Sequence, residues 1–127
     1  MKTQYTMALT LIAGVAIGTA AIEALHAQAK AVYTCAEIQI SDINGYMKEF
    51  APVAQAALKT SGSQLLAAGP GTSIEGEPPK TRVTVRRYNS LEEAKAAYSS
   101  PQYKEARKMA DKYGAKFRVF AVEALSQ

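Results

Sequence analysis

The chain of 127 residues has one cysteine, one histidine and no tryptophan. A single cysteine, Cys35, cannot form a disulfide within the chain. Ser-His-Asp and Cys-His catalysis, histidine-ligated zinc and two-histidine iron sites all need imidazole, and His26 is the one histidine available. The sequence therefore argues against a conventional hydrolase and against metalloenzymes of these types, and it implies no cofactor.

A strong excess of one charge sign is also absent. Lysine and arginine total 15 against 11 acidic residues, which gives a net charge of +4, and the basic residues are scattered among acidic ones. Nucleic-acid-binding proteins more often gather basic residues on one face with aromatic residues between them. The nearest approach to such a face is Arg82, Arg86 and Arg87, with Arg107 and Lys108 later. We therefore expect no nucleic-acid partner.

One long apolar run, from Met7 to Ile22, follows Lys2 and precedes the small-residue sequence Ala27-Gln28-Ala29. These are the three parts of a secretory signal peptide. At about 1.5 Å per residue the run falls short of the roughly 30 Å hydrocarbon core, which favours cleavage over a permanent span. We expect residues 1–29 to be a signal peptide and residues 30–127 a single periplasmic or secreted domain without stable membrane insertion. A retained anchor is the alternative.

Cleavage after Ala29 would remove His26 and leave Cys35 in an oxidising compartment. Cys35 could then be a reactive thiol or a cross-link between subunits. Because no histidine or helix start is near it in sequence to lower its pKa, we interpret it as a small buried residue of a strand.

Hydrophobic content of 48% and charged content of 20% are typical of one folded domain. Hydrophobic periodicity and turn residues predict its elements. Strands are expected at Ala31–Ile40, Gln64–Ala68, Arg82–Tyr88 and Lys116–Glu123, and helices from Asp42 to about Gly62 and from Leu91 to Tyr113. Pro52 should bend the first helix, Ser90 and Glu93 form a capping box, and Ser100-Pro101 restarts the second helix.

This order predicts the α+β, ferredoxin-like β-α-β-β-α-β arrangement, a four-stranded antiparallel sheet with two helices on one face. We place Tyr33 and Tyr88, with Phe117 or Phe120, on the open face. A small monomer rarely exposes so much apolar surface, so we expect a homodimer that pairs two sheets face to face as a dimeric α/β barrel.

The mature chain resembles the bacterial family known as domain of unknown function 1330, in the dimeric α/β-barrel superfamily. The residues that carry the resemblance are Gly62, Leu66-Ala67, Gly69, Glu75-Gly76 before Pro79, Arg82-Val83, Tyr88-x-Ser90, Ala94, Tyr98 and Ser100-Pro101-Gln102-Tyr103. Three residues depart from the family pattern. Ala68 stands where the family often has a basic residue, Arg87 where it tends to have an acidic residue, and Gln102 where it has glutamate. The resemblance implies a dimer with a pocket between sheet and helices, in a superfamily that includes cofactor-independent monooxygenases and heme enzymes. It implies no activity, and the missing histidine disfavours heme ligation.

Five residues are candidates for binding a small molecule. Tyr33 and Glu37 on the first strand and Arg86 and Tyr88 on the third would share the open face, and Tyr103 belongs to the family motif. Tyrosine and arginine could orient an anionic aromatic substrate, with Glu37 as a base if burial raises its pKa. Alternatively, Glu37 and Arg86 form a cross-strand pair at a dimer interface and the protein is a non-catalytic interaction module. A monooxygenase-like enzyme is a further alternative.

Overall fold

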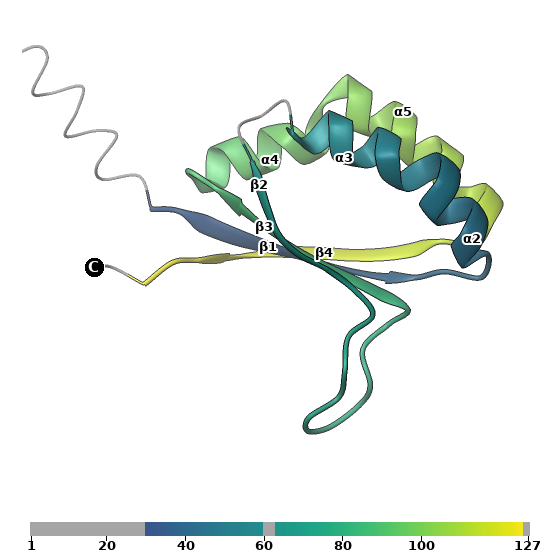
Figure 1. The fold of residues 1–127 in the computed structure, drawn as a ribbon. Coiled ribbons are helices and arrows are strands. Elements are labelled where there is room, and N and C mark those ends of the chain that lie inside the picture. The colour runs from purple at the N-terminus through teal and green to yellow at the C-terminus, as the bar shows by residue number, and fades with distance from the viewer. Residues whose placement is uncertain (1–29, 60–62, 126–127) are drawn as a thin grey trace, which may run out of the picture.

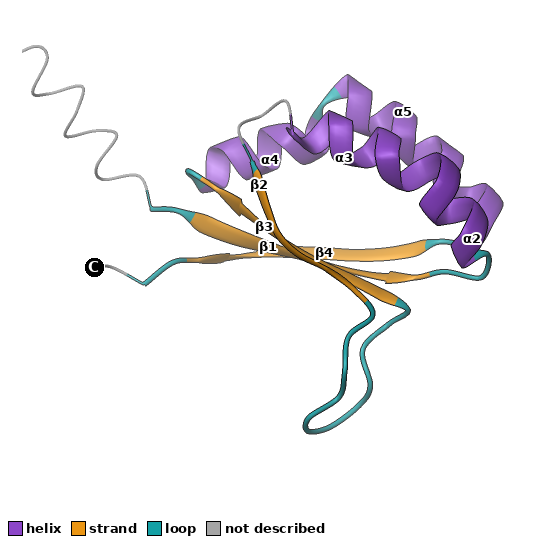
Figure 2. Ribbon diagram, in the orientation of Figure 1, coloured by secondary structure: helices purple, strands orange, loops and turns teal. Residues whose placement is uncertain are grey.

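A computed structural model describes residues 30–59 and 63–125 of the protein. Four strands form one antiparallel sheet in the order β2-β3-β1-β4, and the helices all cover the same face of it (Figures 1 and 2). This is the predicted ferredoxin-like arrangement. The predicted signal peptide and the predicted helix end at Gly62 lie outside the described residues.

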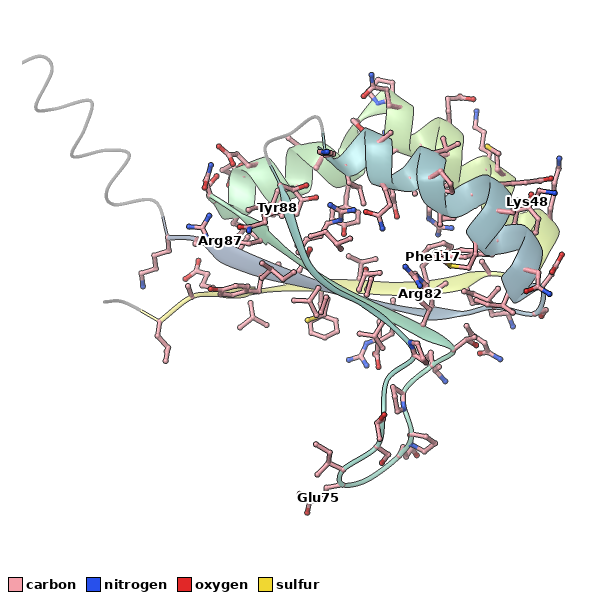
Figure 3. The ribbon with its side chains drawn as sticks, in the orientation of Figure 1. Lys48, Glu75, Arg82, Arg87, Tyr88 and Phe117 are labelled. Atoms are coloured by element: carbon pink, nitrogen blue, oxygen red, sulfur yellow. The ribbon has the colours of Figure 1, made fainter. Side chains whose placement is uncertain are left out.

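The elements begin and end within about two residues of the predicted positions. Their bounds are β1 Val32–Gln39, α2 Ile43–Gly45, η1 Tyr46–Phe50, α3 Ala51–Lys59, β2 Gln64–Gly69, β3 Arg82–Tyr88, α4 Leu91–Ser99, α5 Pro101–Ala110, η2 Asp111–Tyr113 and β4 Lys116–Glu123. A long loop joins β2 to β3 and projects away from the helices, with Glu75 at its far end (Figure 3).

The first helical segment is irregular where Pro52 predicts a disturbance. The helix η1 is a π turn, and the Ala51 N–H donates to the Tyr46 carbonyl five residues earlier. Pro52 has no N–H to donate to Lys48, so the usual helical pattern cannot continue through this point. Such turns are frequent at functional sites. Here Met47, Ala51 and Pro52 all line one cleft.

Helices α4 and α5 begin at the predicted capping residues. Ser90 Oγ accepts the Glu93 N–H at 3.1 Å, and Glu93 Oε2 accepts the Asn89 N–H at 3.2 Å. Ser100 Oγ accepts the Tyr103 N–H at 3.2 Å, at the point where Pro101 starts the next helix. Each side chain satisfies a backbone donor that has no partner inside the helix.

The core lies between the sheet and the helices in two adjoining clusters of buried residues. One contains Ala36, Ile38, Ile40, Tyr46, Phe50, Ala51, Ala54, Ala106, Ala110, Tyr113 and Ala115. The other contains Val32, Ala57, Leu58, Tyr88, Ala94, Ala97 and Tyr103. Many of these side chains are alanines, so the helices approach the sheet closely around a few large aromatic rings.

Strand register corrects one prediction about the sheet faces. Val32 pairs with Tyr88, and Thr34 pairs with Arg86. Because Val32 and Thr34 are buried under the helices, Arg86 and Tyr88 are buried there too. Their predicted position on the open face, shared with Tyr33 and Glu37, is wrong.

The neighbouring strands follow the same parity. Val83 and Val85 lie on the open face beside β1, where the sequence pattern alone would favour burying them. In β4, Phe120 pairs with Cys35 on the open face, whereas Phe117 pairs with Ile38 and packs against the core. Cys35 is half-buried on the open face.

Candidate functional site

A cleft of about 630 Å³ lies between α3 and β2. Its apolar wall is formed by Met47, Ala51, Pro52, Ala56 and Leu65, and its polar lining by Gln55, Lys59, Ser63, Gln64, Arg82 and Arg86. The cleft exists because β2 is an edge strand whose helix-facing side is left uncovered, as its exposed Leu65 shows. A cavity with mostly apolar walls and a few polar groups is typical of small-molecule sites.

Arg86 is the most unusual residue of the cleft. Its side chain is only 2% exposed, and Nη1 donates a hydrogen bond of 3.1 Å to Ser63 Oγ. Ser63 Oγ in turn donates to the Leu58 carbonyl at 2.7 Å. Nη2 of Arg86 is buried without a hydrogen bond to any described residue. A guanidinium stays charged at any physiological pH, so this is a buried positive charge without a carboxylate.

Burying such an unpaired charge lowers the stability of the folded protein. A buried ion normally has a partner of opposite charge, since desolvation is otherwise uncompensated. Among the described residues, no aspartate or glutamate lines the cleft, whereas Arg82 and Lys59 add two further cations. The lining therefore carries only positive formal charge, which is the electrostatic character of an anion-binding site.

A second, much smaller cavity of about 30 Å³ lies nearer the core, among buried residues such as Ile38 and Phe50. The two share Ala51, Gln55, Arg82 and Arg86 as lining residues. Arg82 and Tyr88 both extend from β3 to the helix side of the sheet (Figure 3). The site therefore consists of a wide outer cleft and a small inner cavity, and both arginines line the two of them.

Three tyrosines form a chain of tilted and edge-to-face ring contacts. The ring centroids of Tyr88 and Tyr98 are 6.2 Å apart, and those of Tyr98 and Tyr103 are 5.0 Å apart. The pKa of Tyr88 is raised to about 12, mainly by burial and to a smaller extent by Tyr98, while nearby Ser63 and Arg86 partly oppose the shift. Burial also raises the pKa of Tyr103. Both phenols are therefore protonated at neutral pH and can donate hydrogen bonds but cannot act as bases.

Thr34 Oγ1 and Tyr88 Oη resemble Arg86 Nη2 in being buried without a hydrogen bond to any described residue. Thr34 lies opposite Arg86 on β1, and Tyr88 lies two residues beyond it on β3. Buried polar atoms are nearly always bonded in native proteins, so each such atom calls for an explanation. The three atoms belong to neighbouring positions on the helix-facing side of the sheet.

The structure separates the five predicted site residues into two groups. Arg86, Tyr88 and Tyr103 come together between sheet and helices, while Tyr33 and Glu37 lie on the opposite face. Glu37 Oε2 pairs with Arg118 Nη1 at 3.1 Å, so the predicted Glu37–Arg86 pair does not form. The predicted role of Glu37 as a base in a shared pocket with Arg86 therefore has no geometric support.

Several lining residues were not singled out by the sequence. Gln55 and Lys59 are polar positions on one side of α3, and Ser63 follows that helix. Nothing in their local pattern distinguishes them from surface residues. Arg82 carried a usable signal, because it shares the alternation of Arg86 along β3. Within residues 30–59 and 63–125, no cluster of three potential metal ligands occurs and no helix combines the length and apolarity needed to cross a membrane.

A family profile described as "Domain of unknown function (DUF1330)" matches residues 31–125. The chain belongs to the DUF1330 family. No curated protein sequence matches this DUF1330 chain. Its fold is the ferredoxin-like arrangement that the sequence resemblance implied.

Solved structures resemble this DUF1330 domain at low sequence identity. A protein of unknown function from Rhodopseudomonas palustris is 14% identical with a TM-score of 0.60, covering 84% of this chain and 93% of that one. SnoaB, a cofactor-independent oxygenase from Streptomyces nogalater, is 7% identical with a TM-score of 0.57, covering 78% and 97%. HapK from Hahella chejuensis is 14% identical with a TM-score of 0.56, covering 76% and 94%. At these identities the likeness concerns the fold alone.

Proposed function

We propose that this DUF1330 domain binds a small organic anion in the cleft between α3 and β2. The anionic group would bond to Arg86, and the apolar body would lie against Met47, Pro52 and Leu65. This moves the predicted ligand site from the open sheet face to the helix side.

The observation that carries the proposal is the buried guanidinium of Arg86 with its unpartnered Nη2. An anion at Nη2 would satisfy a hydrogen-bond donor and compensate a buried charge at the same time. Charge-assisted hydrogen bonds of this kind are about twice as strong as neutral ones. The apolar wall supports an organic anion over an inorganic one, because it offers surface for a hydrocarbon body.

Benzoate and its neutral analogue benzamide test this proposal. They have similar size and shape but differ in charge, so thermal unfolding of residues 30–127 should shift upward with benzoate and much less with benzamide. Arg86→Gln should abolish the benzoate shift. Arg87→Gln is the matched control, because Arg87 is the next residue of β3, lies on the other face and bonds to Asn89 Oδ1.

Equal shifts with benzoate and benzamide would contradict an anion site. So would a benzoate shift that survives Arg86→Gln or that disappears equally in Arg87→Gln. Circular dichroism of both variants establishes that they retain the wild-type fold.

We also propose that the domain is a homodimer formed through the open sheet face. The supporting observation is an apolar group on that face, in which Tyr33, Phe120 and Val122 are all substantially exposed beside Val83 and Val85. Isolated apolar residues on a surface are ordinary, but a contiguous group on a sheet is typical of an interface. Sedimentation velocity should give twice the mass of the mature chain, and a monomer across the micromolar range would refute the dimer.

Export is the third part of the proposal. The sequence features of residues 1–29 support a cleaved signal peptide. The mass of the protein isolated from a bacterial envelope fraction should correspond to a chain that begins at Lys30. A mass that includes residues 1–29 would favour the retained anchor.

A further inference from the structure

We infer that the ligand of the cleft is a dianion with two separated carboxylates, one held by Arg86 and the other by Arg82. This inference rests on the proposed anion site and names the chemical class that it selects. Its basis is the pair of arginines on β3, because the proposed function assigns an anionic group to Arg86 and none to Arg82.

Arg82 and Arg86 lie on the same face of one strand. Both alternate with Val83, Val85 and Arg87, which face the other way. Both line the outer cleft and the inner cavity. Four residues of extended strand separate their Cα atoms by about 13 Å, at about 3.3 Å per residue. Side chains that project straight from the strand at this spacing present two separate guanidiniums, each of which can receive its own carboxylate.

The two arginines of the cleft differ from the other arginines of β3 and β4. Arg87 bonds to Asn89, and Arg118 forms an ion pair with Glu37 at 3.1 Å. Arg86 has only the Ser63 hydroxyl. The half-buried Arg82 side chain forms no hydrogen bond or ion pair with a side chain of the described residues, although it lies near enough to Tyr46 to lower the pKa of that phenol. Neither guanidinium that lines this cleft is paired with a carboxylate of the described residues.

Electrostatics favours occupation of both positions. Two like charges over one partly desolvated cavity raise the energy of the empty protein, and a single negative charge neutralises only one of them. Arginine presents a planar fork that matches a carboxylate. A linear dicarboxylate supplies two such groups joined by a hydrocarbon chain. The apolar wall of the cleft offers surface for that chain.

The experiment compares linear dicarboxylates from succinate to suberate with monocarboxylates of equal chain length, and with inorganic phosphate, by titration calorimetry. We expect the best dicarboxylate to bind wild-type protein about tenfold more tightly than its monocarboxylate counterpart, because a second charge-assisted contact forms. Arg82→Gln should remove this preference while leaving monocarboxylate affinity within about twofold, and Arg82→Lys should retain part of it.

Arg87→Gln is the matched control, since Arg87 lies on the same strand, faces the other side of the sheet and bonds to Asn89 Oδ1. It should preserve the dicarboxylate preference. Lys59→Gln tests the third cation of the cleft, which lies on α3. Loss of the preference in Lys59→Gln but not in Arg82→Gln would overturn the assignment to Arg82. Tighter binding of phosphate than of any dicarboxylate would overturn the ligand class.

The failure of this inference is distinguishable from failure of the anion site. Monocarboxylates that bind in an Arg86-dependent way without any gain from a second carboxylate would overturn the dianion and leave the proposed function intact. Absence of binding by every anion, benzoate included, would overturn both.

Discussion

Arg86 links the stability of this protein to its proposed binding role. The residue is almost fully buried and has one neutral hydrogen-bond partner among the described residues. In the empty protein such a guanidinium lowers stability, because water solvates it better than the protein does. Functional positions often hold residues that lower stability, and Arg86, which lines the cleft, fits this pattern.

Replacing Arg86 with methionine should therefore stabilise the ligand-free protein. Methionine fills similar volume without a charge, and we expect the free energy of unfolding to rise by about 1 to 3 kcal/mol. Urea unfolding of wild type and Arg86→Met measures the difference. Arg87→Met, on the same strand, should change stability by no more than about 0.5 kcal/mol. A loss of stability in Arg86→Met would mean that the guanidinium is structurally compensated.

The buried tyrosines predict a loss of stability at alkaline pH. Burial raises the pKa of Tyr46 and of Tyr88 to about 12, against an ordinary value near 10. Between these values the unfolded chain releases phenolic protons that the folded chain keeps, so rising pH favours unfolding. The contribution of these phenols to the free energy of unfolding is complete below pH 10 and is lost as the pH rises toward 12. The free energy of unfolding falls by no more than about 1.4 kcal/mol per pH unit for each tyrosine.

Urea unfolding between pH 8 and pH 11 measures this effect, and Tyr88→Phe identifies its source. The variant lacks one of the shifted phenols, so its stability should decline less steeply above pH 10 than that of wild type. Parallel declines would show that Tyr88 does not contribute.

At the scale of elements, local sequence chemistry decided where helices begin and end. Ser90 and Ser100 are hydrogen-bonded caps at the predicted positions, and Pro52 coincides with the π turn. These signals are reliable because each depends on a backbone group only a few residues away. Gly114, in the left-handed region, ends the last helical turn before β4.

Gly114 and Gly76 form a matched pair for testing this end. Both have positive φ, 64° and 83°, but a Cβ on Gly114 would lie 2.6 Å from Ser41 Oγ, while one on Gly76 meets nothing within 4 Å. Gly76→Ala should cost about 1 kcal/mol from backbone conformation alone, and Gly114→Ala more, because Ser41 must also move. Chemical unfolding checks the order. A smaller loss at Gly114 would mean that Ser41 moves away freely.

At the scale of the whole molecule, the helix-free face of the sheet should control assembly. Val122 and Val53 are both exposed valines, at 55% and 43%, but Val122 lies on the open face and Val53 on α3. Val122→Asp should weaken the dimer by at least about tenfold, because two symmetry-related charges would be desolvated in the interface. Val53→Asp should leave it unchanged. Sedimentation at several concentrations measures both, and equal effects would exclude the open face.

The sequence by itself determined the element order, the helix caps and the fold class, because periodicity, proline and capping residues act over short distances. It also indicated the buried face of β1, where Val32, Ala36 and Ile38 recur at every second or fourth position and Glu37 and Gln39 fall on the other face. The buried face of β3 was decided only by the tertiary structure. One side of β3 carries valines and the other carries arginines and a tyrosine, so the local pattern allows either side to be buried. Pairing with β1 places Arg86 opposite the buried Thr34 and so buries the side that carries Arg86. The cleft followed from that choice, since its walls come from α3 and its charge from β3, segments that meet only when the sheet and helices pack.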